Sequence, residues 1–467
     1  MSRPTYLSFY LCGLAGLCVI ASPATPQSAA PARGQSYSFA SLSSTLEASD
    51  NYNLSTNSAG NALLWTNTLS TGLVSVTPVD NLDASVSGDI RAAELPTDAD
   101  EFSIDNGTIN LNFNRIVDDN SLYFRLFFND ADIEFVDPLR TVDDQGNFDD
   151  TLGQGRRRLT NLNAGASLAA NGPFSFDIDG SMRLRDYRDI TDSSLEDGER
   201  YSVSSNLGFE ISPVLRAVLY GQYSEYDQTD IVGGSSKQTT STAQLGFDGT
   251  ISQRLSTEVR LGYGQAKSVQ DGVTDKDQDG ISGRLRFLLD MPNGTADAQF
   301  NARQTENGQR NDLQFSRSIA LRSGSLSGSL GVTNSDLTDI RPIAGLNYVY
   351  NLPTTRVSVG FRQTATVDDD GNDVINVNLS AALNHSITPL SSVGVSILAA
   401  RREELTDFTS DGDLSRLTVS AQYSHLLTKD WQLTGGISHR QRLEDDSDDA
   451  LENSLFLTLG RSWYSLR

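Results

Sequence analysis

The sequence predicts an all-β fold, an antiparallel transmembrane β-barrel of the kind found in Gram-negative outer membranes. Three observations predict it: an export signal at the N-terminus, segments of alternating apolar and polar residues along most of the remaining chain, and connectors that are alternately short and long. Such a barrel turns one face of each strand to lipid and the other to its lumen, so the contributions of apolar and polar residues cancel in an average of hydropathy along the chain. The mean hydropathy of −0.33 is consistent with this arrangement.

The first residues have the order of a secretory signal peptide. Arg3 supplies a positive start, and an apolar run followed by small residues and prolines extends to Pro26. The apolar run is shorter than the roughly 20 residues that a spanning helix needs, which argues against a retained membrane anchor. We therefore expect cleavage after Ala24, with Ala30 and Ala32 as later possibilities.

Both cysteines of the chain, Cys12 and Cys18, lie in this segment. The mature chain then has no cysteine, which excludes a disulfide scaffold, thiolate metal sites and cysteine nucleophiles. A lipid anchor on Cys18 is disfavoured, because Leu17 stands where a lipid-attachment motif has a small residue. The expected organisation is a signal peptide at 1–24, a short periplasmic segment at 25–36 and the barrel at 37–467.

Hydrophobicity alternates with a period of two along the mature chain. The pattern is clearest at 82–91, 174–185 and 255–263, where apolar or small residues take one set of alternate positions and mostly polar or charged residues the other. This alternation predicts strands, and helical spacing of apolar residues is nowhere sustained. A soluble sandwich would also alternate. However, about 430 residues of continuous hairpins exceed one sandwich core, whereas a barrel grows by adding hairpins.

The connectors between these segments fall into two classes. Short turns are expected near 77–81, 117–120, 170–173, 212–213, 252–253, 291–294, 323–324, 351–354, 387–390 and 427–430. Longer polar and acidic connectors include 130–155, 186–199, 225–236, 266–280, 402–413 and 442–452. Tight periplasmic turns that alternate with longer outer loops are typical of outer-membrane barrels.

Counting connectors predicts the number of strands. Ten short turns and eleven longer connectors give about 22 strands, within a range of 16–22 because 313–321 and 340–350 are weak strand patterns. An even number places both termini on the periplasmic side. Only about a dozen residues separate the cleavage site from the first strand near Tyr37, so we expect no plug domain. A plugged TonB-dependent transporter is therefore disfavoured despite its similar strand count.

Charge separates the expected lumen from the expected loops. The formal net charge of −24 argues against a nucleic-acid partner. The strand assignment places the following charged residues on the lumen face: Asp83, Asp89, Arg91, Arg125, Asp177, Asp179, Arg183, Arg185, Arg216, Glu258, Arg260, Arg284, Arg286, Arg303 and Arg362. With Glu210, Asp248 and Asp297 on the same face, acids and arginines nearly balance, so the net negative charge must lie in the long connectors.

These inward charges allow two interpretations, because a charge in a membrane-embedded wall needs either water or a partner. In the first, the lumen is a polar conduit whose arginines suit anionic sugars or small anions. In the second, the charges only pair between neighbouring strands and stiffen the wall.

No pattern predicts a catalytic, cofactor or metal site. Residues 275–280 resemble the start of a calcium loop, but the twelfth position is Arg286 where such loops have a bidentate Glu, so an acidic solvated loop is favoured. His385 and His425 are expected at periplasmic strand ends and His439 at an outer end, so the histidines form no site. We predict a protein that is not an enzyme, with a barrel-embedded hydrolase as the least favoured alternative.

The last strand resembles the C-terminal signal that the barrel-assembly machinery reads during insertion of outer-membrane proteins. Leu455, Leu457, Leu459 and Trp463 share one face of this strand. The chain departs from the pattern because it ends in Ser465-Leu466-Arg467 instead of an aromatic residue.

Residues 46–55 carry a second resemblance. A strand that runs into Asp50-Asn51-Tyr52-Asn53 is similar to the putative outer-membrane β-barrel porin family, some members of which are linked to exopolysaccharide production. The resemblance implies a barrel for passage or export of solute or polymer and transfers no functional residue. We therefore expect a polar conduit, porin-like or accessory to surface polysaccharide export, in contact with lipid and lipopolysaccharide. The alternative is a closed structural barrel that presents acidic loops for surface interaction.

Overall fold

The computed structural model describes residues 35–96, 101–137, 139, 154–190, 195–229, 234–367, 372–405, 414–444 and 449–466. The described residues form one short 3-10 helix and 22 strands. The helix is η1 (Ile133–Phe135) and the strands are β1 (Gln35–Ser49), β2 (Ala62–Val76), β3 (Asp80–Glu94), β4 (Glu101–Val117), β5 (Asn120–Asp132), β6 (Arg156–Leu168), β7 (Phe174–Arg188), β8 (Asp197–Ser212), β9 (Leu215–Thr229), β10 (Ser235–Ser252), β11 (Leu255–Gln270), β12 (Val273–Met291), β13 (Gly294–Thr305), β14 (Gly308–Leu321), β15 (Gly324–Asn334), β16 (Arg341–Asn351), β17 (Thr355–Val367), β18 (Asp373–Thr388), β19 (Ser391–Glu404), β20 (Leu414–Leu426), β21 (Trp431–Glu444) and β22 (Ala450–Leu466). The predicted signal peptide lies outside the described residues.

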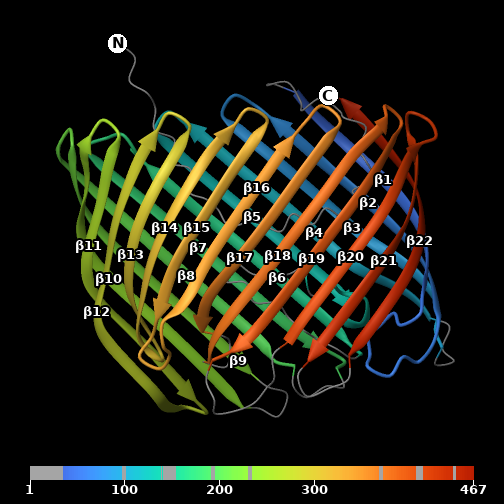
Figure 1. Cartoon of the computed structure of the whole chain (residues 1–467), viewed down its shortest axis with the longest axis horizontal. Coiled ribbons are helices and arrows are strands. Elements are labelled where there is room, and N and C mark those ends of the chain that lie inside the picture. The colour runs from blue at the N-terminus through green and yellow to red at the C-terminus, as the bar shows by residue number, and fades with distance from the viewer. Residues whose placement is uncertain are drawn as a thin grey trace.

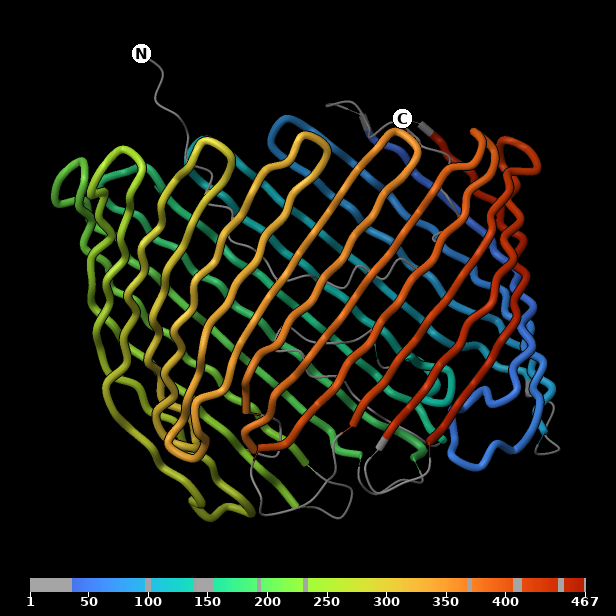
Figure 2. The backbone as a smooth tube through the Cα atoms, viewed as in Figure 1, coloured from blue at the N-terminus to red at the C-terminus, as the bar shows by residue number. Residues whose placement is uncertain are grey.

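The strands form one closed antiparallel barrel. Each strand pairs with its neighbours in the sequence, and the sheet closes where β1 pairs with β22 from Tyr37–Leu466 to Ser49–Ser454. Figures 1 and 2 show the strands tilted along the wall, as closure of a sheet requires. The prediction of 22 antiparallel strands is confirmed, and the weak patterns at 313–321 and 340–350 lie in β14 and β16.

The two ends of the barrel differ in their connectors. The turn end, at the top of Figure 1, carries the ten connectors of two to five residues that join each even-numbered strand to the next. All ten were predicted as short turns. β1 begins and β22 ends at this end as well. The loop end carries the connectors that join each odd-numbered strand to the next, and most of these are longer.

The prediction of a long acidic connector at 266–280 is wrong. β11 and β12 continue through this segment and are joined by Asp271-Gly272 alone. Both turn residues have positive φ, 50° and 77°, which suits the left-handed turns of two-residue hairpins and favours an Asp-Gly pair. A second connector of this end, Glu306-Asn307, is equally short.

The segment resembling a calcium loop is therefore extended strand. Asp277 pairs with Lys267 and Asp279 with Gln265 across the β11–β12 ladder, and alternate side chains point to opposite faces. The outward carboxylates already accept hydrogen bonds, Asp279 from the Tyr263 hydroxyl and Asp277 from the Gln265 amide at 3.0 Å. A strand of this geometry does not wrap a cation as a calcium loop does.

The β1–β22 seam is closed at the loop end by the residues after β1. The backbone N–H and the side-chain amide of Asn453 donate to the Asp50 carboxylate at 2.6 and 2.9 Å, and the Asn51 amide donates to the Leu451 carbonyl at 2.9 Å. The backbone hydrogen bond from Asn453, followed by that from its amide, lowers the pKa of Asp50 below its ordinary value. The Asp-Asn pair thus extends the contact between the first and last strands beyond the ladder.

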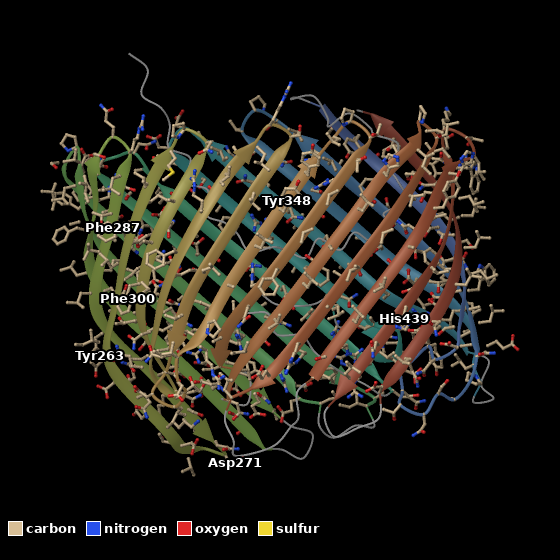
Figure 3. The ribbon with its side chains drawn as sticks, viewed as in Figure 1. Tyr263, Asp271, Phe287, Phe300, Tyr348 and His439 are labelled. Carbon is tan, nitrogen blue, oxygen red and sulfur yellow. The ribbon has the colours of Figure 1, made fainter. Side chains whose placement is uncertain are left out.

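The outer surface of the barrel is apolar. Large apolar side chains point outward on nearly every strand, such as Leu261 and Leu330, which are 64% and 71% exposed. Tyr263 and Phe287 project from the left edge of the wall in Figure 3. Soluble monomers rarely expose contiguous apolar patches above a few hundred Å². Within the described part of the chain, no helix is long and apolar enough to cross a bilayer.

Barrel closure can be tested with a disulfide across the seam. Thr45 and Thr458 are register partners, and their hydroxyls lie 2.8 Å apart. We expect the variant Thr45→Cys/Thr458→Cys to form a disulfide on mild oxidation, seen as loss of two titratable thiols and a faster band on a non-reducing gel. In the control, Thr45→Cys/Ser454→Cys, the two positions are offset by about 13 Å along the strands, too far for a disulfide. Equal cross-linking of both variants would contradict the register.

Candidate functional site

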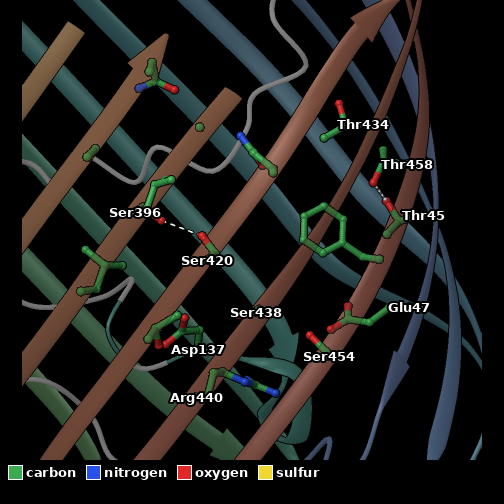
Figure 4. Close-up of a pocket in the computed structure, with 18 of the residues that line it drawn as sticks. Thr45, Glu47, Asp137, Ser396, Ser420, Thr434, Ser438, Arg440, Ser454 and Thr458 are labelled. Carbon is green, nitrogen blue, oxygen red and sulfur yellow. Dashed lines mark hydrogen bonds between the residues drawn. The ribbon is translucent and has the colours of Figure 1, made fainter. Parts of the chain in front are cut away.

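A cavity of about 460 Å³ lies in the lumen and is the candidate functional site. Its walls are the inward faces of β1, β2 and β16–β22, with one residue from β3, and connector residues Tyr52, Phe135 and Asp137 line it at the loop end. Figure 4 shows part of this lining, with Glu47, Asp137 and Arg440 among the labelled side chains. Thirteen of the 34 lining residues are Ser or Thr and only five carry a charge, so the wall is mainly neutral and hydroxylated.

The hydroxyl groups of this wall pair with one another between strands. Ser396 and Ser420 lie 2.7 Å apart, and Ser424 and Thr434 lie 2.9 Å apart, in addition to the seam pair Thr45–Thr458. A hydroxyl has one donor and two acceptor positions, so a paired hydroxyl can still bind water or a polar solute. The wall can therefore hydrogen-bond a solute without contributing a charge.

The charges of the cavity gather toward its loop end. Arg440 forms an ion pair with Glu452, whose carboxylate also accepts from Ser49 at 2.7 Å. Arg440 donates a further hydrogen bond to the Tyr52 carbonyl at 2.9 Å. Because Tyr52 directly follows the Asp50-Asn51 pair, the motif after the first strand also positions an aromatic residue over the lumen.

A second connector enters the lumen beside Tyr52. The Asp132 side chain caps η1 by accepting from the Glu134 N–H at 3.1 Å, and the helix directs Phe135 inward. The Phe135 ring stacks on Tyr52 at 5.8 Å, and the Arg91 guanidinium lies 3.7 Å from its centroid. Arg91 is itself fixed by Asp105 at 2.8 Å, in a pair whose side chains are only 8% and 1% exposed.

Leu139 continues this segment across the lumen. It packs against Ala400, with Leu398 and Leu414 beside them, on β19 and β20. These strands are separated from β5 by eight and seven strand positions, respectively, around the closed sheet. The connector after β5 therefore joins two distant parts of the wall and narrows the space between them.

All fifteen charged residues predicted for the lumen lie in strands, at positions that alternate with the outward apolar residues. They fall on β3 (Asp83, Asp89, Arg91), β5 (Arg125), β7 (Asp177, Asp179, Arg183, Arg185), β9 (Arg216), β11 (Glu258, Arg260), β12 (Arg284, Arg286), β13 (Arg303) and β17 (Arg362). Of these, Arg91 lines the cavity. Most of the others belong to a second wall, β7–β13.

Several of these charges are brought together as ion pairs within and between strands. Glu258 lies 3.1 Å from Arg260 on its own strand and 3.6 Å from Arg284 on β12. On the neighbouring strands, Arg286 pairs with Asp297 at 2.5 Å. The lumen thus has a charged, internally paired wall at β7–β13 and a hydroxylated wall at β16–β22, β1 and β2.

The histidines do not come together. His385 contacts Thr355 at 2.9 Å near the turn end, and His439 contacts Asn453 at 2.9 Å near the loop end (Figure 3). His425 stacks on Tyr423 on β20. Among the described residues, no group of three His, Cys, Asp or Glu side chains is placed to hold a metal ion.

Sequence reasoning missed the connector aromatics and the hydroxylated wall. Tyr52 and Phe135 lie in connectors, where no periodicity assigns a face. The sequence does contain a pattern that indicates the hydroxylated wall, because Ser396, Thr418, Ser420 and their neighbours occupy alternate positions of their strands. The prediction of lumen residues considered charged side chains only and therefore did not include these hydroxyl groups.

The Arg440–Glu452 pair provides a test of this geometry. Glu452 is almost fully buried, so Arg440→Met leaves an uncompensated carboxylate and should lower the free energy of unfolding by about 3–5 kcal/mol. The double variant Arg440→Met/Glu452→Gln should recover much of this loss. Removing Arg401 from its pair with Glu403, where both side chains are at least 40% exposed, should cost about 1 kcal/mol or less. Denaturant titration of protein refolded into vesicles measures all three, and equal losses would contradict the burial of Glu452.

Comparison with known proteins shows the fold alone. No family model matches the chain, and no curated protein matches it in sequence. Among solved structures, it is similar to the siderophore receptor PiuA from Acinetobacter baumannii, with a TM-score of 0.54, 8% identity, and 92% of this chain and 82% of that chain covered. The ferric-catecholate import receptor Fiu from E. coli K12 has a TM-score of 0.54 and 10% identity, with 91% and 81% covered. The FrpB iron transporter from Neisseria meningitidis has a TM-score of 0.52 and 8% identity, with 93% and 83% covered.

Proposed function

We propose that this chain is an outer-membrane β-barrel that forms a polar conduit. The observation that carries the proposal is the inversion of polarity across the wall, with exposed apolar side chains outside and a hydroxylated, charge-lined cavity inside. A membrane barrel requires this arrangement, whereas a soluble sheet has the opposite one. The structural similarity to transport receptors supports the same class of function.

The orientation follows from the connectors. The turn end faces the periplasm and the loop end faces the exterior. β1 therefore begins, and β22 ends, on the periplasmic side. Residues 1–24 act as the export signal, the barrel-assembly machinery inserts the chain, and the loop end contacts lipopolysaccharide. The barrel works without a plug domain, because segments of its own connectors, at Tyr52 and Phe135, already occupy the lumen.

The cargo is a small polar solute, or the conduit assists export of surface polysaccharide. The hydroxylated wall supports this assignment, since it binds through many neutral hydrogen bonds. The arginines of the opposite wall are already partly neutralised by the carboxylates with which they pair, which weakens the case for a dedicated anion channel.

A closed structural barrel is the second candidate. It is favoured by the inward connectors, because Tyr52, Phe135 and Leu139 narrow the lumen and bind its wall. In this alternative the ion pairs stiffen the barrel, and the acidic loop end is presented to other molecules.

Planar-bilayer recordings separate the two candidates. The purified protein should produce discrete conductance steps, and Phe135→Ala should enlarge them because it removes a ring from the narrowed lumen. Phe174→Ala, which removes a ring that is 62% exposed on the outer face, is the matched control and should leave the step size unchanged. Absence of conductance at every voltage and salt concentration would favour the closed barrel.

Membrane embedding predicts a contrast between adjacent residues of β15. Leu330→Arg introduces a charge on the lipid face and should lower the free energy of unfolding from vesicles by about 2–4 kcal/mol if the residue lies near the bilayer midplane. Ser329→Arg places the same charge on the lumen face, where water is available, and should cost far less. Equal losses, measured by denaturant titration in vesicles, would argue against a lipid-facing outer surface.

A further inference from the structure

The hairpin formed by the ends of β13 and β14 leaves the wall and folds inward. Pairing between β12 and β13 stops at Gly283–Ala302, although β13 continues to Thr305 and β12 extends back to Val273. Beyond that point Gln304 packs on the inner face of β11 and β12. Its side chain fills the space where a Cβ of Gly264 or Gly280 would lie, 3.5 and 2.4 Å from its nearest atoms.

The inner face of β11 is buried where this hairpin covers it. Ala266 and Ser268, which point inward on β11, are 2% and 6% exposed, and Gln304 itself is 7% exposed. The hairpin tip, defined as residues 304–310, therefore lies over part of the loop-end mouth instead of extending the wall.

An ion pair fastens the tip to a distant strand. Arg310 on β14 contacts Asp373 at the start of β18 at 2.5 Å, and their side chains are 2% and 0% exposed. Neighbouring strands lie about 4.8 Å apart, so four strand positions correspond to about 19 Å along the wall. A direct contact over that distance is possible because the tip bends away from the wall and because β15 and β16 are shorter than the strands on either side of them.

Asp373 is the centre of the fastening. Besides Arg310, it accepts hydrogen bonds from Ser335 at 2.6 Å, Asn307 at 3.2 Å and Thr338 at 3.3 Å. Asn307 in turn accepts from Lys276 of β12 at 2.9 Å. The tip is thereby tied to both sides of the mouth, to β12 on one side and β18 on the other.

The contacts that hold the tip are polar. None of the three hydrophobic clusters found among the described residues includes a residue of the tip. Water can replace hydrogen bonds and ion-pair contacts when the tip moves away, whereas a packed apolar contact has no such substitute. The arrangement therefore suits a segment with two positions, closed when Asp373 is engaged and open when it is released.

We propose that the β13–β14 tip is a lid over the loop-end mouth and that the Arg310–Asp373 pair is the latch that holds it closed. The role of the lid as a gate rests on the proposed conduit, but the movement of the lid can be measured independently of conduction. The alternative is a tip that is a permanent part of the wall.

Thiol accessibility tests the movement. In Gly264→Cys the new thiol lies beneath Gln304, and the predicted mature chain has no other cysteine. Adding Asp373→Asn should raise the rate of alkylation by a membrane-impermeant maleimide by about tenfold or more, because the closed position loses its charged partner. The matched control is Asp297→Asn. It removes a carboxylate from β13, one of the two strands of the hairpin, at a position outside the tip. Equal rates in all three proteins would overturn the lid.

A disulfide staple tests the gate. A Cβ at Gly264 would lie 3.6 Å from that of Gln304, within the range for a disulfide, so Gly264→Cys/Gln304→Cys should lock the lid closed on oxidation. In an Asp373→Asn background the reduced protein should conduct more than the parent, and oxidation should abolish the increase. Identical conductance in both redox states, with a conducting parent, overturns the lid while the conduit stands.

Two further results keep the proposals distinguishable. Faster alkylation of Asp373→Asn without conductance in any variant supports the lid and rejects the conduit. Folding of Asp373→Asn is checked by its heat-modifiable gel mobility. If this variant does not fold, the double variant Arg310→Gln/Asp373→Asn, which removes both charges of the pair, is used in its place. Unchanged alkylation in that double variant overturns the latch.

Discussion

The pairing of β1 with β22 closes the sheet, so that every strand has a partner on both sides. A sheet in lipid must satisfy its backbone N–H and C=O groups within itself, so the proposed membrane location requires this closure. The ladder from Tyr37–Leu466 to Ser49–Ser454 joins the two ends of the chain and leaves the sheet without an edge. Asp50 and Asn51 continue that contact beyond the ladder by binding Asn453 and Leu451. Closure depends on a contact between residues more than 400 positions apart, although every other strand pairing is between neighbours in the sequence.

Once the sheet is closed, strand alternation decides the surroundings of every side chain. Outward positions carry Leu, Val, Phe and Tyr, which meet lipid if the proposed membrane location holds, whereas inward positions enclose the lumen. The inward positions are not uniform. One wall pairs its charges within and between strands, as Glu258 does with Arg260 of its own strand and Arg284 of β12, and the other carries hydroxyl groups with little charge. A solute in the lumen would therefore meet neutral hydrogen-bonding groups on one side and partly neutralised charges on the other.

The loop end adds a second level of organisation. Tyr52 and Phe135 enter from one side, and the β13–β14 tip enters from another. The first entry is held by stacked rings and the apolar contacts of Leu139, and the second by polar contacts centred on Asp373. This difference in chemistry assigns them different roles, with a fixed narrowing where apolar surface is buried and a movable cover where water can replace the contacts.

The sequence by itself determined the fold class, the ten short turns and the strand number, because these depend on local alternation and turn chemistry. It also placed charged residues such as Asp177 and Asp179 of β7, Glu258 and Arg260 of β11, and Arg284 and Arg286 of β12 at positions that alternate with outward apolar residues, since a period of two assigns faces without reference to the partner strand. Local patterns failed where acidity was taken to indicate a loop. Residues 275–280 are strand because Asp271-Gly272 makes the turn. Only the tertiary structure decided which connectors enter the lumen, and the Phe135–Tyr52 and Arg310–Asp373 contacts join segments whose proximity arises from closure of the barrel.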